Sequence, residues 1–186
     1  MANNCEFEML VVGAEKNVDE FIQMIQWKGK YEDNGLGRVF LAEADKIIIR
    51  ENQVFCLVYG DCAWSILSSM MKKNSSALSL ENASKNLNLL IEAYSSEPGV
   101  GFQEHFVIAN GIILVNECLD YFEAYIEDWD EDKLTKLSNN ENKSVEAIKE
   151  SVRERDGYYC YGGFGDNYGD YSIVFGIVQN NGVFKI

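Results

Sequence analysis

The sequence has one proline, Pro98, one histidine, His105, and comparatively few basic residues. Lys and Arg together number 16 against 30 Asp and Glu, which gives a formal net charge of -14. A surface this acidic repels phosphate backbones and anionic lipid, so direct nucleic-acid binding and membrane attachment are not expected. A basic protein surface is the partner that this charge favours. Acidity that serves only solubility is the alternative.

Long apolar runs and spaced cysteine pairs are also missing. No apolar run approaches the length of a membrane span, and no basic region precedes an apolar run at the N-terminus, so we expect a soluble, cytoplasmic protein. The five cysteines are scattered and never form a Cys-x-x-Cys pair, which argues against a disulfide framework and a zinc site. There is no Walker motif, and the glycines after Pro98 lack the third glycine of a dinucleotide loop. No cofactor is expected.

The first half of the chain alternates strand-like and helix-like segments. Asn17 followed by Glu20 predicts an N-cap, and Ser79 predicts a second one. The expected strands are Cys5 to Val12, Arg38 to Ala42, Lys46 to Arg50, Gln53 to Tyr59 and Leu89 to Tyr94, with helices after Asn17, over Cys62 to Met71 and up to Leu87. This β-α-β-β-α-β order predicts an α+β, ferredoxin-like antiparallel sheet with its helices on one face.

A β-hairpin is expected next. Phe102 to Ala109 and Ile112 to Leu119 flank Asn110-Gly111, a pair that supplies the positive φ angles of a two-residue turn. Counting outward from the turn places His105 opposite Asn116 and Glu104 opposite Glu117.

The remainder of the chain differs in composition. We predict a helix from Asn142 to Arg155, a Gly/Tyr-rich loop, a strand from Ser172 to Val178 and a turn at Asn181-Gly182 before a short last strand. The expected organisation is a core with its added hairpin over residues 1–120, and an acidic segment, helix and β extension over 121–186 packed on the same domain.

Between Glu117 and Asp132 the chain has eight acidic side chains and no basic one, interleaved with aromatic residues. Such a row of carboxylates can imitate phosphates, while Tyr and Trp supply the contact area of a tight interface. A solvated helix face or linker is the alternative. The predicted partner-binding residues are Glu104, Glu117, Asp120, Tyr121, Glu123, Tyr125, Glu127, Asp128, Trp129, Asp130, Glu131 and Asp132.

Two other functions are alternatives. A metal-assisted hydrolase or nuclease could use Glu104 and Glu117 if the predicted register brings them together, although His105 then lies on the opposite strand face. A single-stranded nucleic-acid binder could stack bases on Phe102 and Phe106, but basic residues do not surround them. No nucleophile is recognisably placed for His105, so no catalytic residue is assigned.

Three segments resemble the YubB-like ferredoxin-like family of phage, plasmid and other mobile-element proteins. They are the opening Asn-Cys-Glu-Phe-Glu-Met-Leu-Val-Val-Gly with Val-Asp-Glu-Phe, Gly-Asp-Cys-Ala-Trp-Ser at 60–65, and Glu-Pro-Gly-Val-Gly-Phe at 97–102. The resemblance covers residues 1–120 in pieces and implies a ferredoxin-like core and a mobile-element origin. It implies no catalytic residues.

Charge, the acidic segment and this resemblance together favour a non-enzymatic binding protein that acts against a host nucleic-acid-binding system. The most concrete form is an anti-CRISPR inhibitor of a Cas nuclease or of its guide-RNA complex.

Overall fold

The computed structural model describes residues 4–26, 38–50, 53–71, 79–125, 131–153 and 158–181. The strands are β1 (Asn4–Ala14), β2 (Val39–Arg50), β3 (Gln53–Ala63), β4 (Leu90–Glu97), β5 (Phe102–Ala109), β6 (Ile112–Tyr125) and β7 (Tyr158–Gly162). The helices are α1 (Glu15–Ile25), α2 (Leu80–Asn86), α3 (Glu131–Glu141), α4 (Val145–Arg153) and α5 (Ser172–Asn181), with the short η1 (Leu67–Met71) and η3 (Gly165–Asn167). This confirms the α+β class.

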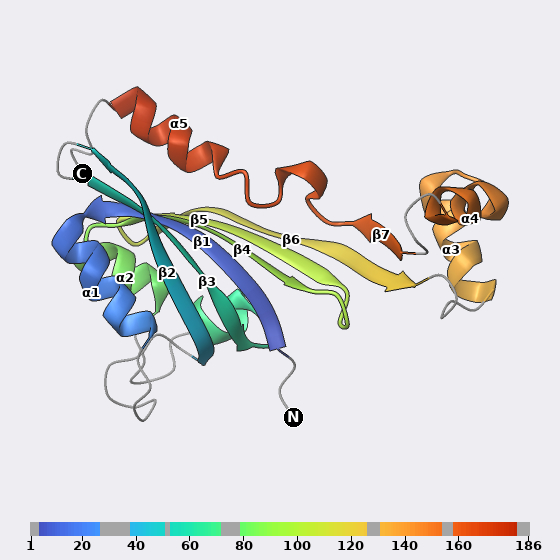
Figure 1. Cartoon of the computed structure of the whole chain (residues 1–186), viewed down its shortest axis with the longest axis horizontal. Helices are drawn as coiled ribbons and strands as arrows, with labels where there is room; N and C mark the ends of the chain where they lie inside the picture. The colour runs from blue at the N-terminus through green and yellow to red at the C-terminus, as the bar shows by residue number, and fades with distance from the viewer. Residues whose placement is uncertain are drawn as a thin grey trace.

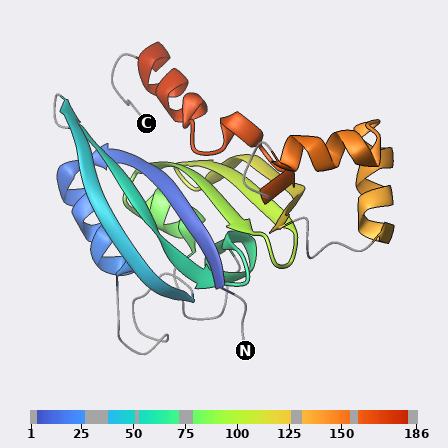
Figure 2. The same ribbon diagram turned by 45° about the vertical axis from the view of Figure 1, so that its right-hand side comes forward.

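All seven strands form one antiparallel sheet in the order β2-β3-β1-β4-β5-β6-β7. Helices α1 and α2 lie on one face of the sheet, whereas α5 lies on the other face; α3 and α4 lie next to each other beyond the end of β6 (Figures 1 and 2). The two helices of the first half, α1 and α2, thus share one face as predicted, whereas α5 covers the other face and was not predicted as a helix. We call the two sides of the sheet the α1 face and the α5 face.

Each face of the sheet has its own apolar core. Alternate residues of β1, such as Met9 and Val11, pack with α1 and α2, while Leu10 and Val12 pack with Tyr171 and Val174 at the start of α5. The central strands are thus buried on both sides, which explains why Met9 to Val12 reads as an unbroken apolar run.

Of the two predicted N-caps, one is confirmed and one is wrong. Ser79 caps α2 by accepting a hydrogen bond from the Asn82 backbone N–H at 3.3 Å, as predicted. Asn17 is not a cap, because α1 begins at Glu15; instead the Asn17 side chain donates to the carbonyl of Leu87 at 2.7 Å. It links the first helix to the end of the second, a contact between distant segments that local spacing cannot show.

The helix predicted over Cys62 to Met71 is much shorter. Cys62 still belongs to β3, and Trp64 has a positive φ of 72° before η1 begins. Trp64 and Leu67 are exposed, while Ile66 and Met70 are buried.

The C-terminal region departs furthest from prediction. Residues 172–178, predicted as a strand, belong to α5, and part of the predicted Gly/Tyr loop forms β7 against β6. The predicted terminal strand lies outside the described residues. β6 continues past the predicted boundary at residue 120, and the division into two segments remains a prediction. Within the described ranges, no helix is long and apolar enough to cross a membrane.

Candidate functional site

The β5/β6 hairpin does not have the predicted register. The Asn110-Gly111 turn forms with φ angles of 48° and 79°, and Ala109 pairs with Ile112 as expected. A bulge then shifts the strands by one residue, because Ile108 pairs with Ile113 but Val107 pairs with Val115. One extra residue in one strand moves every later pair.

This shift separates Glu104 from Glu117. Glu104 pairs with Cys118, while Glu117 pairs with His105, so the two carboxylates lie on opposite faces of the sheet. The prediction that they face each other is wrong. The metal-assisted hydrolase therefore loses the carboxylate pair on which it was based, and no group of three or more His, Cys, Asp or Glu placed to hold a metal is found in the described part of the chain.

Glu104 is buried on the α1 face. Its Oε2 accepts hydrogen bonds from the backbone N–H groups of Ile66 at 2.8 Å and Leu67 at 3.4 Å, and from the Ser95 hydroxyl at 2.7 Å. These donors compensate a carboxylate that is 3% exposed. Glu104 thus fixes the entry to η1 and is not part of the outer surface.

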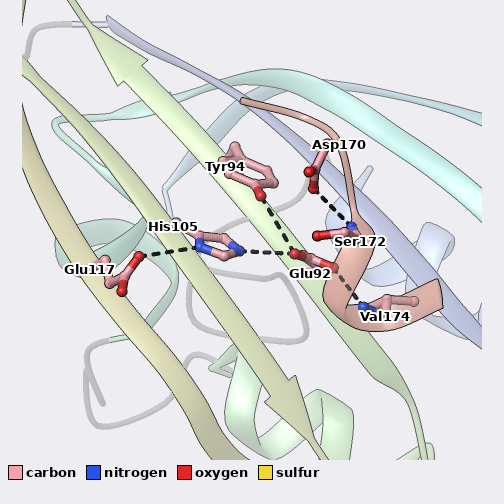
Figure 3. Close-up of polar contacts among 7 residues, drawn as sticks. All are labelled: Glu92, Tyr94, His105, Glu117, Asp170, Ser172 and Val174. Carbon is pink, nitrogen blue, oxygen red and sulfur yellow. Dashed lines mark hydrogen bonds and ion pairs between the residues drawn. The ribbon is translucent and has the colours of Figure 1, made fainter. Parts of the chain in front are cut away.

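His105 joins three strands on the α5 face (Figure 3). Its Nε2 lies 3.0 Å from Oε1 of Glu92, and its Nδ1 lies 3.6 Å from Oε2 of Glu117. Glu92 is fully buried and Glu117 is mostly exposed, so the imidazole connects an internal carboxylate to a surface one. The His105 side chain is only 7% exposed.

Glu92 also holds the start of α5. Its Oε2 accepts the backbone N–H of Val174 at 2.8 Å, and Asp170 Oδ1 accepts that of Ser172 at 2.8 Å (Figure 3). Free N–H groups and the helix dipole make the first turn of a helix favourable for carboxylates. The charge of Glu92 is therefore compensated by α5 as well as by His105.

Aromatic rings enclose this network. Tyr94 stacks on His105 with ring centroids 4.3 Å apart, and Phe164 meets the edges of both rings. Burial, followed by the charge of Glu92, raises the pKa of the Tyr94 phenol. Since the imidazole is covered by rings and both of its nitrogens face carboxylates, the geometry is that of a structural clamp between the sheet and α5. No catalytic role is assigned to it.

The predicted acidic segment is divided among several structures. Glu117 and Asp120 are exposed on β6, Tyr121 is buried, and Glu131 with Asp132 are exposed at the start of α3. Glu123 and Tyr125 belong to β6. Glu127, Asp128, Trp129 and Asp130 lie outside the described residues.

A different acidic surface forms on the α5 face, where β1, β2 and β3 carry carboxylates at alternate positions. Glu6 pairs directly with Asp61, and Glu8 pairs with Tyr59. Tyr59 donates to Glu43 at 3.1 Å and lies 3.2 Å from Asp45. We call this surface the acidic sheet face; its members are Glu6, Glu8, Glu43, Asp45, Tyr59 and Asp61.

Two of the three strands that form the acidic sheet face, β1 and β3, contain no lysine or arginine. Within the described strands, lysine and arginine occur only in β2, at Lys46 and Arg50. Lys46 contacts Glu15 and Asp19 of α1, at 3.0 and 2.8 Å, and therefore serves the opposite face. Burial raises the pKa of Glu8, an effect that the Tyr171 hydroxyl partly opposes.

The spacing of acidic residues in the sequence is a signal for this face. Glu6 and Glu8, and likewise Glu43 and Asp45, are spaced by two residues, which places each pair on one side of its strand. Only the order β2-β3-β1 shows that these pairs adjoin. Comparisons with protein-family models, curated proteins and solved structures gave no match for this chain.

Proposed function

We propose that this protein is a non-enzymatic acidic binding protein that occupies a basic, nucleic-acid-binding surface of another protein. The acidic sheet face is the observation that carries the proposal. It presents carboxylates from three adjacent strands without a lysine or arginine from β1 or β3 among them. A basic channel would meet complementary charge there.

The Glu6–Asp61 pair gives this proposal a physical basis. Like charges directly opposite each other on neighbouring strands destabilise a sheet. A basic partner would relieve that repulsion when it binds, and the relief would make the binding free energy more favourable. Tyr59 and the exposed side chain of Leu41, which pairs with Asp61, add aromatic and apolar contact area beside the carboxylates.

The finer assignments are also proposals. The order β2-β3-β1-β4, with α1 and α2 on one face, supports a ferredoxin-like core within the larger sheet. The resemblance to the YubB-like family supports a mobile-element origin. On these grounds the target is a host defence effector, most concretely a Cas nuclease or its guide-RNA complex, bound in the cytoplasm.

A binding and inhibition assay tests the proposal. The chain is titrated against RNA-guided nucleases, with and without guide RNA, at about 50 mM and about 300 mM salt, a range over which screening of exposed charges grows markedly. We expect binding and loss of nuclease activity at low salt, both weakened at high salt. Absence of binding to every basic nucleic-acid effector at low salt would contradict the proposal.

A matched pair of double variants locates the interaction. Glu6→Gln with Asp61→Asn removes two charges from the acidic sheet face, and Glu146→Gln with Glu150→Gln removes two exposed charges from α4. We expect the first pair to weaken binding about tenfold and the second to change it less than about twofold. Equal effects would mean that only net charge matters and that this face is not the binding surface.

A further inference from the structure

β6 is longer than the strand that covers its outer side. β5 pairs with β6 from Ile112 to Asp120, whereas β7 pairs with it only from Tyr121 to Tyr125. Among the described strands, none pairs with Ile112–Asp120 on the side away from β5. We call this nine-residue stretch the open edge of β6; only its last residue, Asp120, already accepts a hydrogen bond from Gly163 on the outer side, and the rest can accept another strand.

The backbone direction at the open edge follows from two hydrogen bonds. The Gly163 N–H donates to the carbonyl of Asp120 at 2.8 Å on the outer side, while the Tyr121 N–H donates to Gly101 at 3.0 Å on the inner side. Because backbone groups alternate along an antiparallel strand, those of Asn116 and Cys118 also point outward. Both residues are exposed.

The side chains of the open edge resemble those of an interface. Ile112, Ile113, Leu114 and Leu119 are between 39% and 64% exposed. Natural proteins usually protect such edges with lysine, proline or inward charges, and β6 has neither lysine nor proline. Its charged residues at the open edge are the exposed carboxylates Glu117 and Asp120. An added strand would cover apolar surface and meet negative charge.

We propose that the open edge of β6 binds an extended, basic segment of the partner protein by strand addition, with pairing at Asn116 and Cys118. The basic character of that segment rests on the proposed function; the pairing itself rests on the unpaired edge. A second copy of this chain fits less well, because it would add another Glu117, Asp120 and a net charge of -14. Main-chain pairing supplies affinity in this binding mode, and alternate side chains supply specificity.

The probe is a synthetic peptide of about eight residues that alternates lysine and valine, a length typical of a strand. Its matched control carries an N-methyl group on every backbone nitrogen, which removes the N–H donors of both edges but keeps the charge. We expect titration at low salt to show that N-methylation weakens binding about tenfold. Amide hydrogen exchange should slow at Asn116 and Cys118 only with the unmodified peptide.

A variant of the protein tests the same pairing by removing a backbone N–H from β6 instead of from the peptide. Asn116→Pro removes one outward N–H without touching the ladder to β5, a position where an edge strand tolerates proline. Asn116→Ala keeps that N–H. We expect about tenfold weaker peptide binding for Asn116→Pro and unchanged binding for Asn116→Ala. Should Asn116→Pro fail to fold, the two peptides still decide the question with the natural chain.

Three results would contradict strand addition by a basic segment, and each has a different meaning. Equal binding of both peptides, with no protection at Asn116 and Cys118, would overturn strand addition and leave the acidic binding function standing. No binding of either peptide would overturn this inference alone, since the nuclease titration tests the proposed function independently. Concentration-dependent dimers in sedimentation that disappear in Asn116→Pro would assign the edge to a second copy, against our proposal.

Discussion

Two buried glutamates on neighbouring strands hold structures on opposite faces of the sheet. Glu92 of β4 accepts the Val174 N–H at the start of α5, and Glu104 of β5 accepts the Ile66 N–H before η1. Each carboxylate compensates helix-terminal N–H groups that would otherwise lack partners. The singular His105 is explained in the same way, since it completes the hydrogen bonding of Glu92.

Glu92→Gln tests this clamp. The variant keeps the size of the side chain but removes the charge that faces both α5 and His105, so we expect a loss of about 1–3 kcal/mol in the free energy of unfolding. Urea denaturation measures the loss, and amide exchange at Val174 should accelerate. The control is Glu97→Gln on the same strand, where the side chain is only half-buried. An equal loss in both variants would contradict a special role for Glu92.

We expect Glu8→Gln to increase the thermal stability of the protein in a pH-dependent way. Burial raises the pKa of Glu8, so the folded state favours the neutral carboxyl. Below the unfolded pKa the carboxyl is protonated in both states and ionisation costs nothing; the cost appears as the pH rises through the folded pKa. We expect the variant to melt about 2 °C higher at neutral pH, a modest value for a half-exposed group.

Calorimetry at two pH values checks this expectation. The difference between Glu8→Gln and the natural chain should vanish at a pH about one unit below the ordinary carboxyl pKa. Glu20→Gln, an exposed carboxylate on α1, is the control and should change little at either pH. A gain of the same size at both pH values would show that ionisation of Glu8 is not its cause.

At the level of elements, the hairpin shows which features local sequence determines. Asn110-Gly111 predicted the turn, and the bounds of β5 were predicted correctly, because both depend on residues close together in the chain. The bulge beside Leu114 has no comparable signal. Its consequence for Glu104 and Glu117 could therefore not be foreseen, although the alternation of Glu104 and His105 could.

Helix α5 is an element that local sequence does not determine. Ile173, Val174 and Phe175 are β-branched or aromatic and predicted a strand, yet this segment is helical. Its start is held by Glu92 and Asp170, and Val174 is buried against the sheet. Glu92 lies 82 residues before Val174 in the chain. Tertiary contacts with this distant strand therefore outweigh the local preference for a strand.

The connection from β7 to α5 depends on Gly163. Its φ is 68°, and a Cβ there would clash with Oε1 of Gln103, the atom that accepts the Phe164 N–H at 2.9 Å. Gly163→Ala should destabilise the fold by more than about 1 kcal/mol and expose the Phe164 amide to exchange. Gly165→Ala is the matched control, since its φ is 56° but no atom lies within 4 Å of the added Cβ.

Denaturation of the two glycine variants separates strain from crowding. Both should lose the stability that a positive φ costs an alanine, and Gly163→Ala should lose more because of Gln103. Equal losses would mean that the contact with Gln103 does not hold this connection in place.

Considered as a whole, the molecule distributes its charge unevenly between the faces of its sheet. On the α1 face the described lysine of the strands, Lys46, is paired with carboxylates of α1, whereas the acidic sheet face has no such pairing from β1 or β3. The sequence predicted an acidic binding protein with its binding residues at Glu104 and between Glu117 and Asp132, and that location remains a prediction. The acidic sheet face on β1, β2 and β3 was not predicted, because it depends on strand order, which long-range pairing determines.

Asp61→Asn tests whether this face trades stability for binding. Removing one charge of the Glu6–Asp61 pair relieves a cross-strand repulsion, so the variant should be about 0.2–1 kcal/mol more stable at low salt. Added salt should screen the repulsion and shrink the gain. The same variant should bind a basic partner less tightly, because a complementary charge is lost.

Thermal unfolding and partner titration, each at low and high salt, measure the two effects together. Glu150→Gln makes the same change in net charge on α4 and should alter neither quantity appreciably. If Asp61→Asn were less stable than the natural chain at low salt, Asp61 would serve the fold and not the binding surface. If Asp61→Asn were more stable but bound the partner equally well, the repulsion between Glu6 and Asp61 would have no role in partner recognition.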